Sequence, residues 1–181
     1  MKDHTIEQYK KIIDTCKKVF EKKTRDYGTA WRILRLSSIT DQVYIKAMRI
    51  RSIQEKGTQK IAENIHGEFM AIINYCLMAL IQIELIDNIQ MELEYDALEP
   101  LYDKYSAETM NLLANKNHDY NEAWREMRVS SMTDIILMKL LRVKQIEDNN
   151  GTTLISEGVD ANYQDMINYA VFCLIKLDES K

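Results

Sequence analysis

Apolar side chains near the start of the chain recur at the spacing of an α-helix. Within residues 6–23 they are Tyr9, Ile12, Ile13, Cys16, Val19 and Phe20. These positions follow the i, i+3, i+4, i+7 pattern of a helix with one buried face. The sequence therefore predicts a first amphipathic helix over about residues 6–23, followed by a short turn or helix at DYGTAWRIL.

Two longer helices are predicted to follow. One begins after the segment SSITD, where Ser37, Ser38, Thr40 or Asp41 can cap the open N–H groups of the first turn. Glycine at position 57 is a typical stop signal, so we expect this helix to end there. The next helix is predicted to run from about residue 58 to beyond Glu84.

A polar and aromatic phrase occurs twice in the chain. RDYGTAWRILRLSSITD begins at position 25, and NHDYNEAWREMRVSSMTD begins at position 117. Aligning Asp26 with Asp119 gives a spacing of 93 residues, which also carries Trp31 onto Trp124. After one inserted residue the spacing becomes 94, and INYCLMALIQIE then aligns with INYAVFCLIKLD. We therefore read the chain as a tandem duplication, with repeats over residues 1–92 and 93–181.

The duplication and the composition together predict the fold. One proline and five glycines in 181 residues leave little room for the turns of an all-β protein. Three helices in one repeat cannot easily cover their own apolar faces, whereas two repeats packed together can. We therefore predict an all-α fold. It is a single helical bundle built from two tandem repeats, with internal pseudo-two-fold symmetry and about three long helices in each repeat.

Charge, cysteine content and one apolar stretch limit the partners and the compartment. A net charge of −4 and a pI near 5.5 disfavour duplex DNA and anionic membranes. Residues 69–86 approach the length of a membrane span, but Asn74, Gln82 and Glu84 interrupt them. We therefore expect a buried core helix and no membrane association. Three widely separated cysteines and an N-terminus without a signal-type apolar run indicate a cytoplasmic protein.

The duplicated positions are mainly polar, while core positions differ between the copies. Leu34 corresponds to Met127, for example, and such volume-preserving exchanges usually cost under about 1.5 kcal/mol. One interpretation of the shared polar residues is architectural: they cap helices, Trp31 fills the core, and Arg35 pairs with a carboxylate. The other is a ligand site. An aromatic ring beside guanidinium groups and open helix N–H groups suits a nucleobase next to its phosphates.

The ligand-site interpretation assigns the duplicated side chains to two equivalent clefts. On a helix Trp31 and Arg35 lie one turn apart on one face, and Lys46 and Arg49 do likewise. The expected substrate-binding residues of the first repeat are Asp26, Tyr27, Trp31, Arg32, Arg35, Lys46, Arg49 and Asn74. Those of the second repeat are Asp119, Tyr120, Trp124, Arg125, Arg128, Ser130, Ser131, Lys139, Arg142 and Asn168.

Acids of the expected last helix suggest a metal ion. Glu157 and Asn168 are eleven positions apart, which on a helix returns to nearly the same face, and Asp165 lies at its edge. Mg²⁺ needs few protein carboxylates when phosphate oxygens complete its shell. We therefore expect Glu157 and Asp165 to be metal ligands and catalytic residues. In the first repeat Ala71 takes the place of Asp165, so the metal-dependent cleft is predicted in the second repeat.

The chain resembles the family named nucleotide modification associated domain 1 in the segment KKTRDYGTAWRILRLSSITDQVYIKAMRIRSIQ, followed by INYCLMALIQIE. It resembles the family again in NHDYNEAWREMRVSSMTDIILMKLLRVKQIED, followed by EGVDANYQDMINYAVFCLI. This resemblance implies an α-helical domain that handles nucleotides or modified bases. The chain departs from the family pattern at Asn121, in place of the glycine of DYG, and at Ala71, in place of an aspartate.

Three functions stay open on the sequence alone. The favoured one is binding or processing of a nucleotide or a related phosphorylated small molecule. As an enzyme the protein would be a metal-dependent hydrolase of phosphoanhydrides, similar to the all-alpha nucleoside triphosphate pyrophosphohydrolases. The alternative is a non-catalytic protein-interaction module with a structural Trp-Arg-Ser-Asp network. Duplex DNA binding fits least, because the net charge is negative. A homodimer is a further expectation.

Overall fold

The computed structural model describes residues 3–57, 65–120, 122–155 and 157–180. The described part contains helices and connecting segments but no strand, which confirms the predicted all-α fold. The elements in chain order are α1 (Asp3–Tyr27), η1 (Ala30–Ile33), α2 (Leu36–Lys56), α3 (Ile65–Glu84), α4 (Tyr95–Tyr120), η2 (Ala123–Glu126), α5 (Val129–Asp148) and α6 (Val159–Glu179). The short elements η1 and η2 are 3-10 helices.

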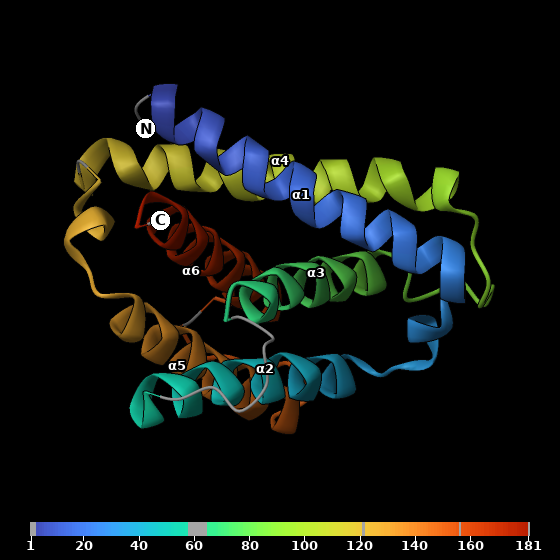
Figure 1. The fold of residues 1–181 in the computed structure, drawn as a ribbon. Helices are drawn as coiled ribbons and strands as arrows, with labels where there is room; N and C mark the ends of the chain where they lie inside the picture. Colours follow the sequence, from blue (N-terminus) through green and yellow to red (C-terminus); the bar gives the residue numbers. More distant parts are fainter. Residues whose placement is uncertain (1–2, 58–64, 121, 156, 181) are drawn as a thin grey trace.

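The long helices form three layers of two (Figure 1). Helices α1 and α4 lie side by side in one outer layer, and α2 and α5 form the opposite one. Between them lie α3 and α6, which pack against each other and against α2 and α5. Because α3 and α6 are covered on both sides, they carry long runs of buried apolar residues. Each layer therefore pairs the equivalent helices of the two repeats.

Contacts between α2 and α5 occur twice with the roles of the repeats exchanged. The Nζ of Lys144 lies 2.6 Å from an oxygen of Asp41, and the guanidinium of Arg51 lies 3.6 Å from an oxygen of Asp134. The spacing of 93 residues relates Asp41 to Asp134 and Arg51 to Lys144. Reciprocal contacts of this kind are expected wherever equivalent elements meet across a two-fold axis.

The start of α2 differs from the sequence prediction. This helix begins at Leu36, and its N-cap residue Arg35 makes no side-chain capping hydrogen bond. Ser37, Ser38, Thr40 and Asp41 therefore lie inside the helix, and the prediction that they cap it is wrong. Burial is the physical reason for Thr40, which has no exposed surface and faces the core. The predicted end of α2 is confirmed, because Gly57 caps it in a left-handed conformation with φ of 63°.

The last helix of the second repeat begins later than predicted, whereas the predicted start of its first-repeat equivalent is not described. In the first repeat the described part of α3 begins at Ile65, and residues 58–64 of the prediction lie outside the described residues. In the second repeat α6 begins only at Val159, after turn-forming residues at 149–151. Glu157 therefore precedes α6, and the prediction that it shares a helix face with Asn168 is wrong.

Helix α3 is long and apolar enough to cross a membrane by length and composition alone. In the folded chain it lies in the middle layer, and 56% of its most apolar window is buried inside the bundle. Its apolar surface is thus largely used in packing against α2 and α6.

Candidate functional site

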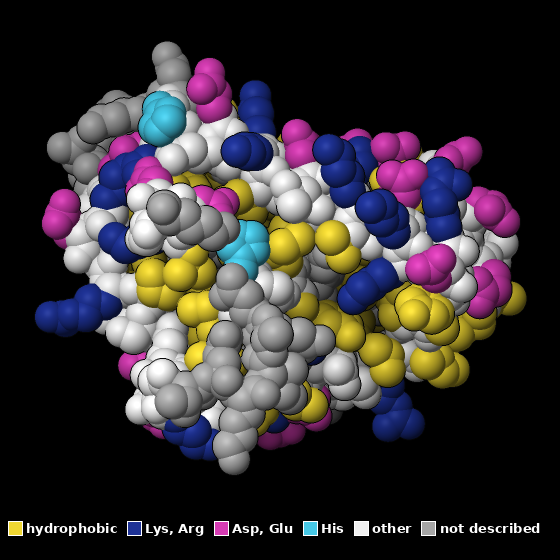
Figure 2. Space-filling view, viewed as in Figure 1, with side chains coloured by type: hydrophobic (Ala, Val, Ile, Leu, Met, Phe, Trp, Pro, Cys, Tyr) yellow, Lys and Arg dark blue, Asp and Glu magenta, His cyan; other side chains and the backbone are white. Residues whose placement is uncertain are grey.

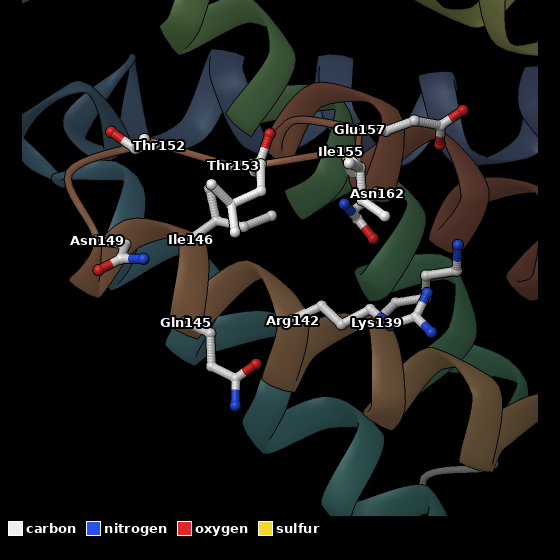
Figure 3. A pocket seen from close by; sticks show the side chains of 11 residues that line it. Lys139, Arg142, Gln145, Ile146, Asn149, Thr152, Thr153, Ile155, Glu157 and Asn162 are labelled. Carbon is white, nitrogen blue, oxygen red and sulfur yellow. The ribbon is translucent and has the colours of Figure 1, made fainter.

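An open hollow of about 830 Å³ lies beside the C-terminal half of α5. Helix α5, the segment that connects it to α6, and the first turn of α6 form its walls (Figure 3). Lys139 and Arg142 project from α5 on one side, Ile155 and Glu157 lie on the other, and the Asn162 side chain lies between these walls. Small-molecule sites in proteins commonly measure about 300–1,000 Å³, so this hollow is large enough for a nucleotide.

Two cations of α5 line the hollow, and they differ in whether a carboxylate is paired with them. The Nζ of Lys139 lies 2.5 Å from the Oδ2 of Asp165, and these side chains are 14% and 16% exposed. Arg142 is exposed, and within the described ranges no carboxylate forms an ion pair with it. The hollow thus combines one paired cation with one guanidinium that is available to a ligand.

The equivalent cations of the first repeat are both held by one carboxylate. The guanidinium of Arg49 lies 2.8 Å from the Oε1 of Glu68, and the Nζ of Lys46 lies 3.4 Å from its Oε2. The Glu68 side chain is only 5% exposed. A carboxylate buried to this extent is unfavourable unless its charge is paired, so Glu68 depends on the two cations.

The acid that pairs with these cations occurs one helical turn later in the second repeat than in the first. The spacing of 94 residues places Asn162 at the position of Glu68, and Asp165 at the position of Ala71. A neutral amide therefore stands in the second repeat where the first repeat has a carboxylate. The buried Asn162 donates its amide N–H to the carbonyl of Gly158, 2.8 Å away, which keeps it in the first turn of α6.

Trp124 does not line this hollow, contrary to the sequence prediction. Its side chain is 5% exposed and stacks on Phe172 with ring centroids 4.1 Å apart and planes inclined by 4°. The guanidinium of Arg125 lies 4.4 Å from the centroid of its ring. The physical reason is that Phe172 faces inward from α6 and buries the indole as part of the core.

Arg32 and Arg125, also predicted to bind substrate, are held within the protein. The buried guanidinium of Arg32 donates to Gln82 and to the carbonyl of Asn88, both at 2.6 Å. Arg125 donates to Glu179 at 2.9 Å. Hydrogen bonds from a glutamine of α1 and from Arg125 hold the pKa of Glu179 below its ordinary value. These two arginines therefore tie each short 3-10 helix to the end of its neighbouring helices.

The remaining predicted residues of the second repeat lie away from the hollow or outside the described side chains. Arg128 and Ser130 are exposed and Ser131 is partly exposed at the N-terminus of α5, whereas the hollow begins at Lys139. At 1.5 Å per residue, Arg128 and Arg142 are separated by roughly 20 Å along the helix. The predicted single cleft wall is therefore not formed. The side chains of residues 119 and 120, Asp119 and Tyr120, lie outside the described residues.

The predicted residues of the first repeat do not form one cleft: Tyr27 and Trp31 line one small hollow and Asn74 lines an adjoining one, whereas the others line neither. Asp26, Tyr27 and Arg35 are exposed, and Trp31 is partly buried. Asn74 and its equivalent Asn168 are buried at 7% and 6% exposure, inside the bundle. Lys46 and Arg49 form a charged cluster with Glu68.

The two predicted metal ligands, Glu157 and Asp165, make different contacts in the described structure. Glu157 lines the hollow, whereas Asp165 is not one of its lining residues and contacts Lys139 instead. Within the described ranges no three His, Cys, Asp or Glu side chains come close enough together to hold a metal ion. The Mg²⁺ site predicted at Glu157 and Asp165 therefore stays a prediction.

Sequence reasoning missed Glu68 and Asn162 as parts of the site. The available signal was their alignment, because an acid faces an amide at one position of otherwise similar helices. It also missed Thr152, Thr153 and Leu154, which line the hollow from the segment before α6. No sequence pattern identified those residues, since the prediction placed a helix there.

A known protein family matches the chain in both repeats. The family model described as nucleotide modification associated domain 1 matches residues 23–83 and again residues 116–177. Searches of curated proteins and of solved structures found no match. The two matched segments cover more than half of the chain, and each contains the short 3-10 helix and the two long helices after it. The chain therefore belongs to the nucleotide modification associated domain 1 family.

Proposed function

We propose that this protein binds a phosphorylated small molecule of the nucleotide class in the hollow between α5 and α6. The observation that carries the proposal is the contact of Lys46 and Arg49 with Glu68 in the first repeat. There the protein's own carboxylate occupies the position between the equivalent cations. In the second repeat Asn162 replaces that carboxylate beside an open hollow and Asp165 pairs with Lys139, so a ligand anion binds at Arg142.

The chemistry of the lining residues supports this class of ligand. A guanidinium binds phosphate oxygens through two parallel hydrogen bonds, and Arg142 is exposed at the hollow. Thr152 and Thr153 add hydroxyl groups, and Ile146 and Ile155 add apolar surface for the face of a base. The description of the family, which links it to nucleotide modification, agrees with such a ligand.

Hydrolysis of the ligand through Mg²⁺ stays a separate prediction. Asp165 is engaged by Lys139, and among the described lining residues Glu157 alone offers a carboxylate to the hollow. No hydrolytic step follows from this arrangement. The binding experiment therefore includes an arm with Mg²⁺, which tests whether the ion raises affinity.

The alternative function, a protein-interaction module with a structural network, is supported by one observation. Trp124 and Arg125 contact each other and lie within the fold. This observation supports a role of those two side chains in stabilising the fold. It does not extend to Lys139 and Arg142, which line the hollow.

Calorimetric titration tests the binding proposal. Inorganic pyrophosphate and a panel of nucleoside mono- and triphosphates are added to the wild-type chain, with and without Mg²⁺. For pyrophosphate we expect one site per chain, and Arg142→Ala is expected to weaken it by at least about tenfold. The matched control is Lys144→Ala, on the same helix but paired with Asp41 outside the hollow. Absence of heat with every ligand, or equal losses in both variants, contradicts the proposal.

A further inference from the structure

Three aromatic rings form a closed cluster in the second repeat. Phe172 is the central ring: it stacks on Trp124 at 4.1 Å and meets the edge of Tyr169 at 6.2 Å with planes inclined by 87°. Both geometries are favourable for aromatic side chains. Phe172 and Trp124 are only 4% and 5% exposed, so these two rings are buried, whereas Tyr169 is partly exposed.

The first repeat has the two outer rings of this cluster and lacks the central one. Trp31 corresponds to Trp124, and Tyr75 corresponds to Tyr169. At the position of Phe172 the first repeat carries Met78. Methionine is unbranched and flexible, so it can move aside for a ligand more easily than a ring can.

Open space accompanies this difference. Two adjoining hollows of about 200 Å³ and 300 Å³ share the side chains of Phe20, Lys23, Tyr75 and Met78, and Trp31 lines the smaller one. Figure 2 shows hydrophobic side chains gathered on this face, where α1 runs beside α3, with Lys or Arg side chains next to them. Within the described residues Lys23 has no ion-pair partner, although it borders both hollows.

We propose that the first repeat binds a planar aromatic ring with an anionic substituent, stacked on Trp31 beside Tyr75. The ring occupies the place that Phe172 fills in the second repeat, and Lys23 neutralises the substituent. This site is separate from the hollow between α5 and α6, and it differs in chemistry because stacking rather than phosphate recognition dominates it. Each repeat therefore keeps a different one of the two sites open. The first repeat fills the anion site with Glu68, and the second repeat fills the aromatic site with Phe172.

Saturation-transfer NMR with 2-naphthoate tests this proposal, and cyclohexanecarboxylate serves as the non-planar acid of equal charge. We expect naphthoate to bind the wild-type chain more tightly than cyclohexanecarboxylate does. Met78→Phe places a ring where the second repeat has one, so it is expected to weaken naphthoate binding by about tenfold or more. Met48→Phe, on the exposed surface of α2, is the matched control and is expected to bind as the wild type does.

Two further variants keep the proposal testable if Met78→Phe lowers the melting temperature. Phe172→Met opens the second cluster, and we expect it to add a second naphthoate site. Lys23→Gln is expected to reduce affinity for the acid several-fold, whereas Arg142→Ala should leave it unchanged. The proposal is overturned if the wild type does not bind naphthoate, if both acids bind equally, or if Arg142→Ala abolishes binding.

Discussion

The hydroxyl of Tyr9 in α1 donates a hydrogen bond of 2.8 Å to the Oδ1 of Asn168 in α6. Its equivalent, Tyr102 in α4, donates an identical 2.8 Å hydrogen bond to Asn74 in α3. Each tyrosine therefore reaches into the other repeat. Burial raises the pKa of both hydroxyls, so they stay protonated and act as donors. The side-chain oxygens of the two buried asparagines have these hydrogen-bond donors only when both repeats are folded together.

Removing either hydroxyl is expected to destabilise the whole bundle. Tyr9→Phe and Tyr102→Phe each leave a buried amide oxygen without its donor, so we expect each to lower the free energy of unfolding by about 1–3 kcal/mol. Urea unfolding followed by circular dichroism measures the change. Tyr105→Phe is the control, because Tyr105 donates to Glu84 in an exposed position, and we expect a loss below about 1 kcal/mol there. Equal losses in all three variants contradict this account.

Introducing a carboxylate at the second-repeat position that corresponds to Glu68 is expected to block ligand binding. Asn162→Glu places an acid where Glu68 stands, next to Lys139 and Arg142. We expect pyrophosphate affinity to fall by at least about tenfold, because Arg142 then has an internal partner, as Lys139 already has in Asp165. The fold should persist, since the first repeat holds a buried acid at this position beside the equivalent cations. Asn162→Gln is the neutral control, and calorimetry that finds both variants equally impaired contradicts the explanation by charge.

The reverse change is expected to open a site in the first repeat. Glu68→Gln removes the carboxylate from Lys46 and Arg49, and the lost charged hydrogen bond lowers the free energy of unfolding by about 1.5–3 kcal/mol. We expect pyrophosphate to recover part of that loss, and calorimetry to report two sites per chain instead of one. An unchanged stoichiometry with intact folding, shown by circular dichroism, contradicts the view that Glu68 stands in for a ligand anion.

A half-buried carboxyl breaks the symmetry between α2 and α5. The hydroxyl of Thr40 lies 2.7 Å from the Oε1 of Glu147 and 2.6 Å from the hydroxyl of Tyr163. At the equivalent contact Gln54 donates to Thr133 at 3.1 Å, so an amide replaces the acid. Burial raises the pKa of Glu147, although hydrogen bonds from Thr40 and Tyr163 partly oppose the shift.

Stability is therefore expected to depend on pH through Glu147. The folded state holds this proton more tightly than the unfolded chain, so the stabilisation is full below the ordinary carboxyl pKa of 4.5 and is lost as pH rises through the raised pKa. Glu147→Gln copies Gln54 and stays neutral. We expect it to match the wild type at about pH 4 and to be more stable at about pH 7.5 in urea unfolding. Glu126→Gln, on an exposed side chain, is the control, and a gap independent of pH contradicts the prediction.

Amphipathic spacing and the duplicated phrase were sufficient to predict the all-α fold, the number of long helices and the end of α2 at Gly57. These features depend on local periodicity and on backbone preferences of single residues. The start of α2 was not predictable in this way. Thr40 has the sequence signature of a cap, but its burial against Glu147 and Tyr163 places it inside the helix.

The sequence by itself determined which residues are repeated, and with them the cations Lys46, Arg49, Lys139 and Arg142 as candidates for an anion site. Only the tertiary structure decided which of these cations face a hollow. Pairing with Glu68 depends on α3 lying against α2, and stacking of Trp124 depends on α6 presenting Phe172 to it. Such contacts join residues distant in sequence, and one substitution, acid to amide or methionine to phenylalanine, changes whether a site is filled or open. Local patterns carry no information on that choice, because it is set by the space and charge that neighbouring helices leave.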